Sequence, residues 1–271
     1  MIELIVALPA AALYLACAWR QWQTIEGRRP AARGLVLSLA MIAALLHLGY
    51  LIIDAANRPA DSPAINFAFF HIGSVIGLVI TLLLLFSSWK KPVENLFVGL
   101  FPMVSIVLLV AAASVSSPQQ TLSNISYGLA WHILLSIVAY SVFLIAAVQS
   151  ILLYFQDRHL RKHQTRGLIQ ALPPLQTMDL LLFEMIWLGM IVLTAAFAIG
   201  WPAVENLQTQ HLMHKIVFAS VGWLVFAMLL IGRYRFGWRG VTASRWTLTG
   251  TAFLVMSYFG SKFVLEVLLN R

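Results

Sequence analysis

The stretch His211–Gly240, HLMHKIVFASVGWLVFAMLLIGRYRFGWRG, decides how this chain folds. It opens with two histidines three residues apart, continues as a long apolar run from Ile216 to Gly232, and closes on three arginines. An apolar run of about 20 residues is long enough to cross a bilayer as a helix. Arginines at one end of such a helix mark its cytoplasmic side. The stretch therefore predicts a membrane-spanning helix whose two histidines lie at the outer surface.

The composition of the whole chain is that of an integral membrane protein. Of its 271 residues, 61% are hydrophobic and 10% are charged, whereas about 25% of a soluble domain is charged. The net charge of +8 comes from short loops, so we attribute it to membrane topology and not to nucleic-acid binding. The single cysteine, Cys17, excludes an intrachain disulfide, a Cys-x-x-Cys thiol reductant and a covalently attached c-type haem.

Apolar runs separated by polar breaks predict an all-α helix bundle with about eight transmembrane helices. Their expected ranges are 2–19, 35–53, 64–87, 95–115, 127–155, 179–200, 212–232 and 246–268. The fifth is long enough to project from the membrane. We find no internal repeat, low-complexity tract or linker, and so predict a single membrane domain over residues 1–271.

Most basic residues fall in alternate loops of this scheme, which is the positive-inside pattern of a plasma-membrane protein of bacterial inner-membrane type. The fourteen that follow it, out of eighteen Lys and Arg, are Arg20, Arg28, Arg29, Arg33, Lys90, Lys91, Arg158, Arg161, Lys162, Arg166, Arg233, Arg235, Arg239 and Arg245. This orientation predicts that both termini lie outside the cytoplasm.

Five of the seven histidines lie in the outer halves of these spans or at their outer ends. They are His47, His71, His132, His211 and His214. A single intramembrane histidine is often only a hydrogen-bonded packing residue, but polar groups in a bilayer are costly and mark pathways or cofactors. Five at one depth indicate a cofactor site. The other two, His159 and His163, lie in a basic loop, and we expect them to be solvated.

Haem fits these histidines better than a bare metal ion does. Zinc sites usually add cysteine or carboxylate ligands, whereas haem needs one or two axial histidines in an apolar slot. Aromatic residues such as Trp131 supply walls, although some of them form the ordinary interfacial belt. Lys215, Arg58 and Lys262 lie at the level where haem propionates would need cations. We therefore expect a non-covalent, b-type haem.

Several segments of the last 145 residues resemble the CcsA/CcmC family of cytochrome c assembly proteins. They are WHILLSIVAYSVFLIAAVQSILLYFQ (131–156), LPPLQTMDLLLFEMIWLGMIVLTAAFAIG (172–200), GWRG (237–240) and TGTAFLVMSYFG (249–260). The resemblance covers about residues 127–271. It implies a polytopic, haem-handling protein in which His132 corresponds to an external haem-ligand histidine.

The chain also departs from that family's pattern. The tryptophan-rich outer loop of the assembly members is cut to WPAVENLQTQ, with HLMHK at the turn. The family's other histidines would fall near Leu269 and near Ile231 or Gly232, and neither is present. This pattern resembles the HemX/YpjD-type branch, whose members lack the tryptophan-rich signature.

The leading interpretation is a membrane protein that binds or handles haem in cytochrome maturation or haem homeostasis, with cytochrome-assembly proteins as partners. The resemblance to HemX implies a second hypothesis, a membrane regulator whose cytoplasmic loops contact haem-synthesis enzymes. A third is a permease or transporter subunit, which the absence of an inverted repeat disfavours.

We expect no enzymatic activity, because no nucleophile or acid–base pair is found. Asp179 and Glu184 lie in the inner half without a partner histidine, and we interpret Asp179 as offsetting the dipole of its own helix.

The axial ligands are expected to be His132 and His214. Spans five and seven both run inward from the outer side, and each carries its histidine within about two turns of that surface. His211 lies one turn further out and is the weaker candidate. His71 and His47, on adjacent antiparallel spans, form the reserve, deeper site.

Overall fold

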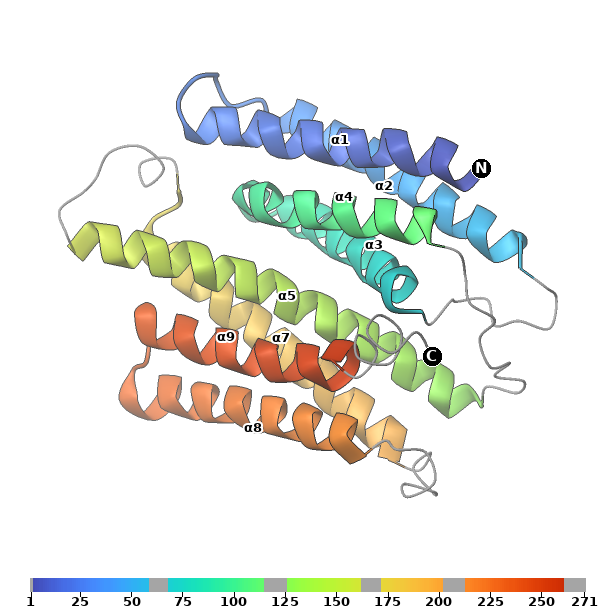
Figure 1. Cartoon of the computed structure of the whole chain (residues 1–271). Helices are drawn as coiled ribbons and strands as arrows, with labels where there is room; N and C mark the ends of the chain where they lie inside the picture. Colours follow the sequence, from blue (N-terminus) through green and yellow to red (C-terminus); the bar gives the residue numbers. More distant parts are fainter. Residues whose placement is uncertain (1, 59–67, 115–125, 162–171, 202–212, 261–271) are drawn as a thin grey trace. The chain divides into compact units, whose positions relative to one another are not determined.

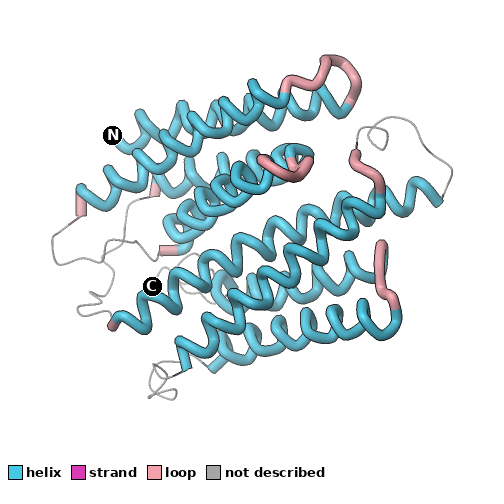
Figure 2. The backbone as a smooth tube through the Cα atoms, turned by 180° about the vertical axis from the view of Figure 1, so that it is seen from behind, coloured by secondary structure: helices cyan, strands magenta, loops and turns pink. Residues whose placement is uncertain are grey.

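The computed structural model describes residues 2–58, 68–114, 126–161, 172–201 and 213–260. All regular structure in these ranges is helical, with no strand among them (Figure 2). The main elements are α1 (Ile2–Ile25), α2 (Arg33–Ala56), α3 (Phe69–Ser88), η1 (Glu94–Leu96), α4 (Phe97–Ala113), α5 (Tyr127–Arg161), α7 (Leu175–Gly200), α8 (Met213–Phe236), α9 (Val241–Val255) and η3 (Met256–Gly260). The prediction of an all-α protein is confirmed.

Seven of the eight expected spans are helices long and apolar enough to cross a membrane. They are α1, α2, α3, η1 with α4, α5, α7 and α8. The helix α5 has 35 residues, or about 52 Å at 1.5 Å per residue, so it exceeds a hydrocarbon core of about 30 Å. The eighth expected span is described only as far as Gly260, as α9 followed by the π-helical turn η3.

The chain divides into two compact units. Unit 1 comprises residues 1–124 and 166–173, and unit 2 comprises residues 125–165 and 174–271. In unit 1, α1 packs against α2 and α4, and α3 packs against the same two helices. In unit 2, α5 packs against α7 and α9, and α8 packs against the same two helices. Helices that follow one another within a unit run antiparallel (Figure 1).

Small residues allow the helices of unit 1 to approach closely. The buried face of α1 carries Ala7, Ala10, Ala11 and Ala18, and that of α2 carries a further set of three alanines. Small side chains favour helix association in membranes because the backbones can come into van der Waals contact. The Ser105 hydroxyl on α4 donates to the carbonyl of Ala11 at 2.7 Å.

Two stacked phenylalanines form the centre of unit 2. Phe143 on α5 and Phe226 on α8 lie with their ring centroids 4.1 Å apart. A Cβ at Gly189 on α7 would come within 2.8 Å of Phe143, and one at Gly250 on α9 within 2.7 Å of Phe226. Each ring therefore fits against a glycine, so all four helices of unit 2 meet at this stack.

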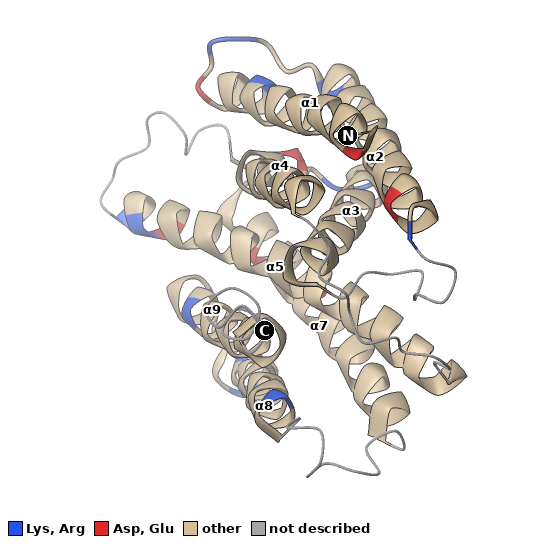
Figure 3. Ribbon diagram, turned by 45° about the vertical axis from the view of Figure 1, so that its right-hand side comes forward, with Lys and Arg blue, Asp and Glu red and all other residues tan. Residues whose placement is uncertain are grey.

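In each unit the basic turns gather at one end of the helices. In unit 1, Arg33 at the start of α2 pairs with Glu94 at 2.6 Å. In unit 2, the turn Gly237–Gly240 between α8 and α9 lies with the end of α5 and the start of α7, because Asp157 and Asp179 both contact it. Figure 3 shows most charged residues near helix ends. We call the end of each unit at which these turns lie its basic end. The opposite end of unit 2 carries His132, and we call it the histidine end.

Candidate functional site

His132 lies at the histidine end of unit 2, in the second turn of α5. Its Nδ1 lies 2.7 Å from the carbonyl oxygen of Ala196 on α7. A carbonyl can only accept a hydrogen bond, so Nδ1 carries the proton and donates it. The lone pair of the neutral ring is then on Nε2. A hydrogen bond that fixes one ring nitrogen in this way is typical of metal-ligating histidines.

Gly200 gives the His132 ring the space that this position needs. It lies one turn after Ala196, on the same face of α7. A Cβ at Gly200 would come within 2.7 Å of Cε1 of the imidazole, which is closer than carbon atoms can pack without displacement. The helix α7 therefore supplies both the hydrogen-bond acceptor and the gap for this ring.

Large aromatic side chains surround the histidine end of unit 2. Trp131 next to His132 is 56% exposed, and Tyr127 and Trp201 are more exposed still. Such residues suit both the interfacial belt of a membrane protein and the walls of a haem slot.

His214 lies at the same end of unit 2, in the first turn of α8, and its side chain is exposed. The helices α5 and α8 run in the same direction (Figure 1). His132 precedes Phe143 by 11 residues and His214 precedes Phe226 by 12, and these two rings stack. Both histidines are thus at a similar height along unit 2, about 17 Å from the stack at 1.5 Å per residue.

The neighbours of His214 belong to the same end. Lys215 is half-buried, and its carbonyl accepts a hydrogen bond from the Ser257 hydroxyl at 2.8 Å. This bond holds η3 at the level of the two histidines. His211 and Lys262 lie outside the described residues.

His47 occupies a different environment, in the interior of unit 1. It is fully buried, its Nδ1 lies 3.3 Å from the Tyr14 hydroxyl, and its Nε2 lies 2.8 Å from the Ser74 hydroxyl. Both ring nitrogens are thus within hydrogen-bond distance of side chains. Iron binding at His47 would require one of these partners to be displaced.

His71 belongs to a second polar cluster in unit 1. Its Nε2 lies 3.7 Å from a carboxylate oxygen of Asp54, and the same carboxylate pairs with Arg58, two residues after the end of α2. All three side chains are at most 15% exposed. Arg58, considered from the sequence as a cation for propionates, therefore already has a carboxylate partner.

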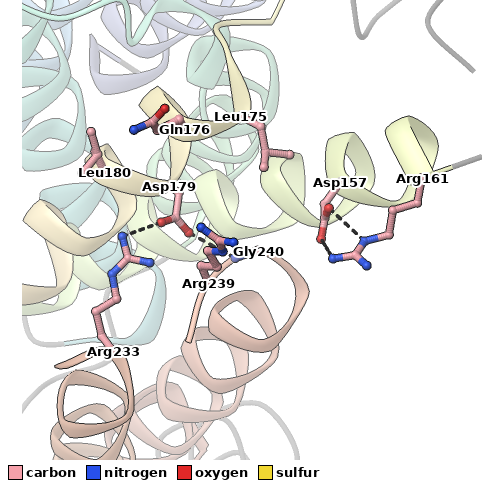
Figure 4. Close-up of a pocket in the computed structure, with 9 residues that line it drawn as sticks. All are labelled: Asp157, Arg161, Leu175, Gln176, Asp179, Leu180, Arg233, Arg239 and Gly240. Carbon is pink, nitrogen blue, oxygen red and sulfur yellow. Dashed lines mark hydrogen bonds and ion pairs between the residues drawn. The ribbon is translucent and has the colours of Figure 1, made fainter. Parts of the chain in front are cut away.

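A cavity of about 490 Å³ lies at the basic end of unit 2 (Figure 4). Asp179 accepts a hydrogen bond from the Gly240 amide at 3.1 Å and pairs with Arg233 at 2.8 Å. Asp157 accepts from the Val241 amide at 3.3 Å and pairs with Arg161 at 3.1 Å. The two carboxylates thus join α5 and α7 to the N-terminus of α9, where a helix dipole favours negative charge.

This geometry corrects the interpretation of Asp179 as a residue that offsets the dipole of its own helix. Its carboxylate reaches the start of α9, 61 residues later in the chain. Asp157, Ala196 and Gly200 also belong to these sites and were not predicted from the sequence. The two positive φ values of the GWRG turn, 66° at Gly237 and 57° at Gly240, explain its two glycines, but no local pattern identifies the aspartates that contact it.

Among the described residues, no group of three or more His, Cys, Asp or Glu side chains could hold a metal ion. A haem site needs fewer protein ligands than this, one or two per iron. His132 fits that requirement, because its Nδ1 is fixed, its Nε2 has no hydrogen bond to any described residue, and Gly200 lies beside its ring.

Comparison with known proteins agrees with this architecture. The model of the family described as cytochrome C assembly protein matches residues 62–269. The inner membrane protein YpjD of Escherichia coli (strain K12) is 27% identical over 240 residues, which cover 87% of this chain and 88% of that protein. An uncharacterized 28.8 kDa protein of Azospirillum brasilense is 30% identical over 74% of this chain and 78% of its own length.

Protein HemX of Brevibacillus brevis is 23% identical over 57% of this chain and 58% of its own length. No solved structure matches the chain significantly. The seven spans and the kinship with an inner membrane protein make this a multi-pass protein of the bacterial inner membrane. Since the family model matches more than half of the chain, the protein belongs to the cytochrome c assembly protein family.

Proposed function

We propose that this protein binds haem at the histidine end of unit 2 and handles it in cytochrome maturation or haem homeostasis. The observation that carries the proposal is the fixed imidazole of His132, whose Nδ1 donates to Ala196 at 2.7 Å. That bond leaves Nε2 as the ligand atom and sets the ring plane. Membership in the cytochrome c assembly family supports haem as the ligand.

His132 and His214 would be the two histidines that hold the haem iron. They begin parallel helices of the same unit at a similar height, and His214 is exposed. The Trp131 side chain would line the haem pocket, and the Lys215 ammonium group would form an ion pair with a haem propionate. His211, outside the described residues, stays the weaker candidate for the second position. When bound, the haem supplies the iron chemistry, and the protein residues hold and orient it.

No residue of this arrangement is proposed to act as a nucleophile or as a general acid or base. The role proposed for the chain is binding and presentation of haem, not an enzymatic reaction.

An absorption spectrum of the protein purified in mild detergent tests the proposal. A Soret band with resolved reduced α and β bands is expected, since two histidines give low-spin haem. The variants His132→Ala and His214→Ala should each leave high-spin haem or none. The matched control is Met213→Leu, which changes an exposed neighbour of His214 and should keep the band. Haem-free protein, with haem supplied during expression, would contradict the proposal.

A second candidate function is that of a membrane regulator of haem-synthesis enzymes, and the match to Protein HemX favours it. Its contact surface would be the loops around residues 159–166 and 233–245. The two functions differ in the partner that co-purifies from cells. A cytochrome-assembly component is expected for the leading proposal, and a soluble haem-synthesis enzyme for the alternative.

A further inference from the structure

The cavity at the basic end of unit 2 lies away from the proposed haem ligands. Its wall is built from the end of α5, the start of α7, the end of α8 and the turn before α9 (Figure 4). The lining residues are Asp157, Arg161, Leu175, Gln176, Asp179, Leu180, Arg233, Arg239 and Gly240. Three arginines and two aspartates leave the lining with one net positive charge.

Both carboxylates of the cavity, those of Asp157 and Asp179, already form hydrogen bonds and ion pairs within unit 2. Each carboxylate accepts from one backbone amide of the α9 start and pairs with one arginine. A Cβ at Gly240 would come within 2.8 Å of an Asp157 oxygen, so the turn fits tightly against them. The aspartates therefore stabilise the wall and are poorly placed to bind a cation.

The arginines retain donors for an anion. A guanidinium carries five N–H groups, and Arg233 uses its own on Asp179 and on the Trp238 carbonyl, 3.0 Å away. The Arg161 side chain remains 74% exposed although it pairs with Asp157. Arg239 lines the cavity, is exposed, and has no ion-pair partner among the described residues. The N–H groups of a guanidinium are spaced so that they can bind two oxygens of a phosphate group, and the resulting charge-assisted hydrogen bonds are strong.

An apolar track leads from the cavity along α7. Leu180 in the cavity wall, Trp187 and Ile191 follow one another at intervals of seven and four residues, so they share one helix face. Each is more than half exposed. Glu184 is exposed on the same face, one turn from Leu180, and it separates Leu180 in the cavity wall from the apolar pair Trp187 and Ile191. A ligand with a phosphate head and an apolar tail suits this combination.

We propose that this cavity binds the phosphate group of an anionic phospholipid from the cytoplasmic leaflet. The positive-inside pattern predicts that the basic end faces this leaflet, whose anionic lipids bind to basic pockets between transmembrane helices. The headgroup contacts Arg239 and Arg161, and one acyl chain follows Leu180 and Trp187. A bound lipid joins α5, α7 and the α8–α9 turn, and it stabilises unit 2 without contact to the haem ligands.

Thermal unfolding of the full chain in mild detergent tests this proposal. Short-chain phosphatidylglycerol should raise the Tm in a saturable way, and phosphatidylcholine of equal chain length should not. Arg239→Gln should require about tenfold more phosphatidylglycerol for half of the effect, the loss expected for one charge-assisted hydrogen bond. Arg161→Gln should shift the response in the same direction.

Arg235→Gln is the matched control, because it removes an exposed arginine of the same helix end that does not line the cavity. Its response should equal that of the wild type. Equal responses to both lipids, or equal losses in Arg239→Gln and Arg235→Gln, would overturn the proposal. If inorganic phosphate gives the same saturable rise at comparable concentration, the ligand is a soluble anion and the lipid assignment is wrong. The haem spectrum of Arg239→Gln should not change, which separates this test from that of the haem site.

Discussion

Unit 1 and unit 2 share one order of helix packing, in which the first and third helices each contact the second and fourth. They differ in where they place their ionisable side chains. Unit 1 buries His47, His71 and Asp54 among partners in its interior. Unit 2 fills its centre with Phe143 and Phe226 and keeps its histidines and arginines at the two ends.

This difference separates two uses of polar residues in a membrane protein. A buried group whose hydrogen bonds are satisfied fixes the packing of its helices, since leaving it unpaired would be costly. A half-buried group with one atom held and another open, such as His132, can bind a ligand. This contrast is why we propose the ligand sites in unit 2 and expect the unit 1 histidines to act in helix packing.

The largest expected effect is that of Asp54→Asn in unit 1. It removes the carboxylate that pairs with Arg58 and faces His71, which leaves a charge poorly compensated in a buried site. Breaking a buried ion pair from one side costs about 3–5 kcal/mol. Thermal unfolding in detergent measures the loss. The control Glu26→Gln breaks the exposed pair with Arg28 and should cost less than about 1 kcal/mol. Equal small losses in both variants would show that the unit 1 cluster is not structural.

Next in size is Gly240→Ala at the basic end of unit 2. The residue has φ 57° and ψ −128°, a conformation open almost only to glycine, and its Cβ would meet Asp157. Strain and overpacking together should cost about 3 kcal/mol. The same unfolding assay measures the change. Gly34→Ala places its methyl group in open space and serves as the control; a comparable loss there would contradict the assignment.

Gly200→Ala should have a smaller effect on stability, about 1–2 kcal/mol, but a large one on the haem band. The added methyl group displaces the His132 ring from Ala196, and overpacking of this kind is moderately costly. Gly128 lies one turn before His132, and a Cβ at this position would meet nothing within 4 Å. The control variant Gly128→Ala should therefore leave the spectrum unchanged. A normal band in Gly200→Ala would mean that the Ala196 contact does not position the ligand.

The smallest expected effect is that of His159→Ala. Its Nδ1 also lies near a backbone carbonyl, that of Phe155 at 2.8 Å, but this carbonyl belongs to its own helix and the residue is exposed at the basic end. No change in the haem band is expected, and the free energy of unfolding should change by less than about 0.5 kcal/mol. Loss of the band in this variant would place the haem at the basic end and reverse the predicted topology.

The span pattern could be read from the sequence because an apolar run of bilayer length dictates a helix. Seven spans and the length of α5 follow from this alone. His132 could be singled out by its depth and by family resemblance. Its acceptor on Ala196 and the gap at Gly200 could not, since both come from a helix about 64 residues later. The partners of Asp157 and Asp179 could not be predicted from the sequence for the same reason, because these residues come into contact only when the helices pack.

Measuring the haem band and the Tm on the same preparations of His132→Gln and His47→Gln distinguishes a haem site in unit 2 from one in unit 1. We predict that His132→Gln loses or shifts the Soret band and unfolds close to the wild-type Tm, because its ring is only half-buried. His47→Gln should keep the band and lose about 1–3 kcal/mol of stability, since it disturbs buried hydrogen bonds to Tyr14 and Ser74. The opposite result, in which His47→Gln loses the band and His132→Gln keeps it, would assign the iron to unit 1.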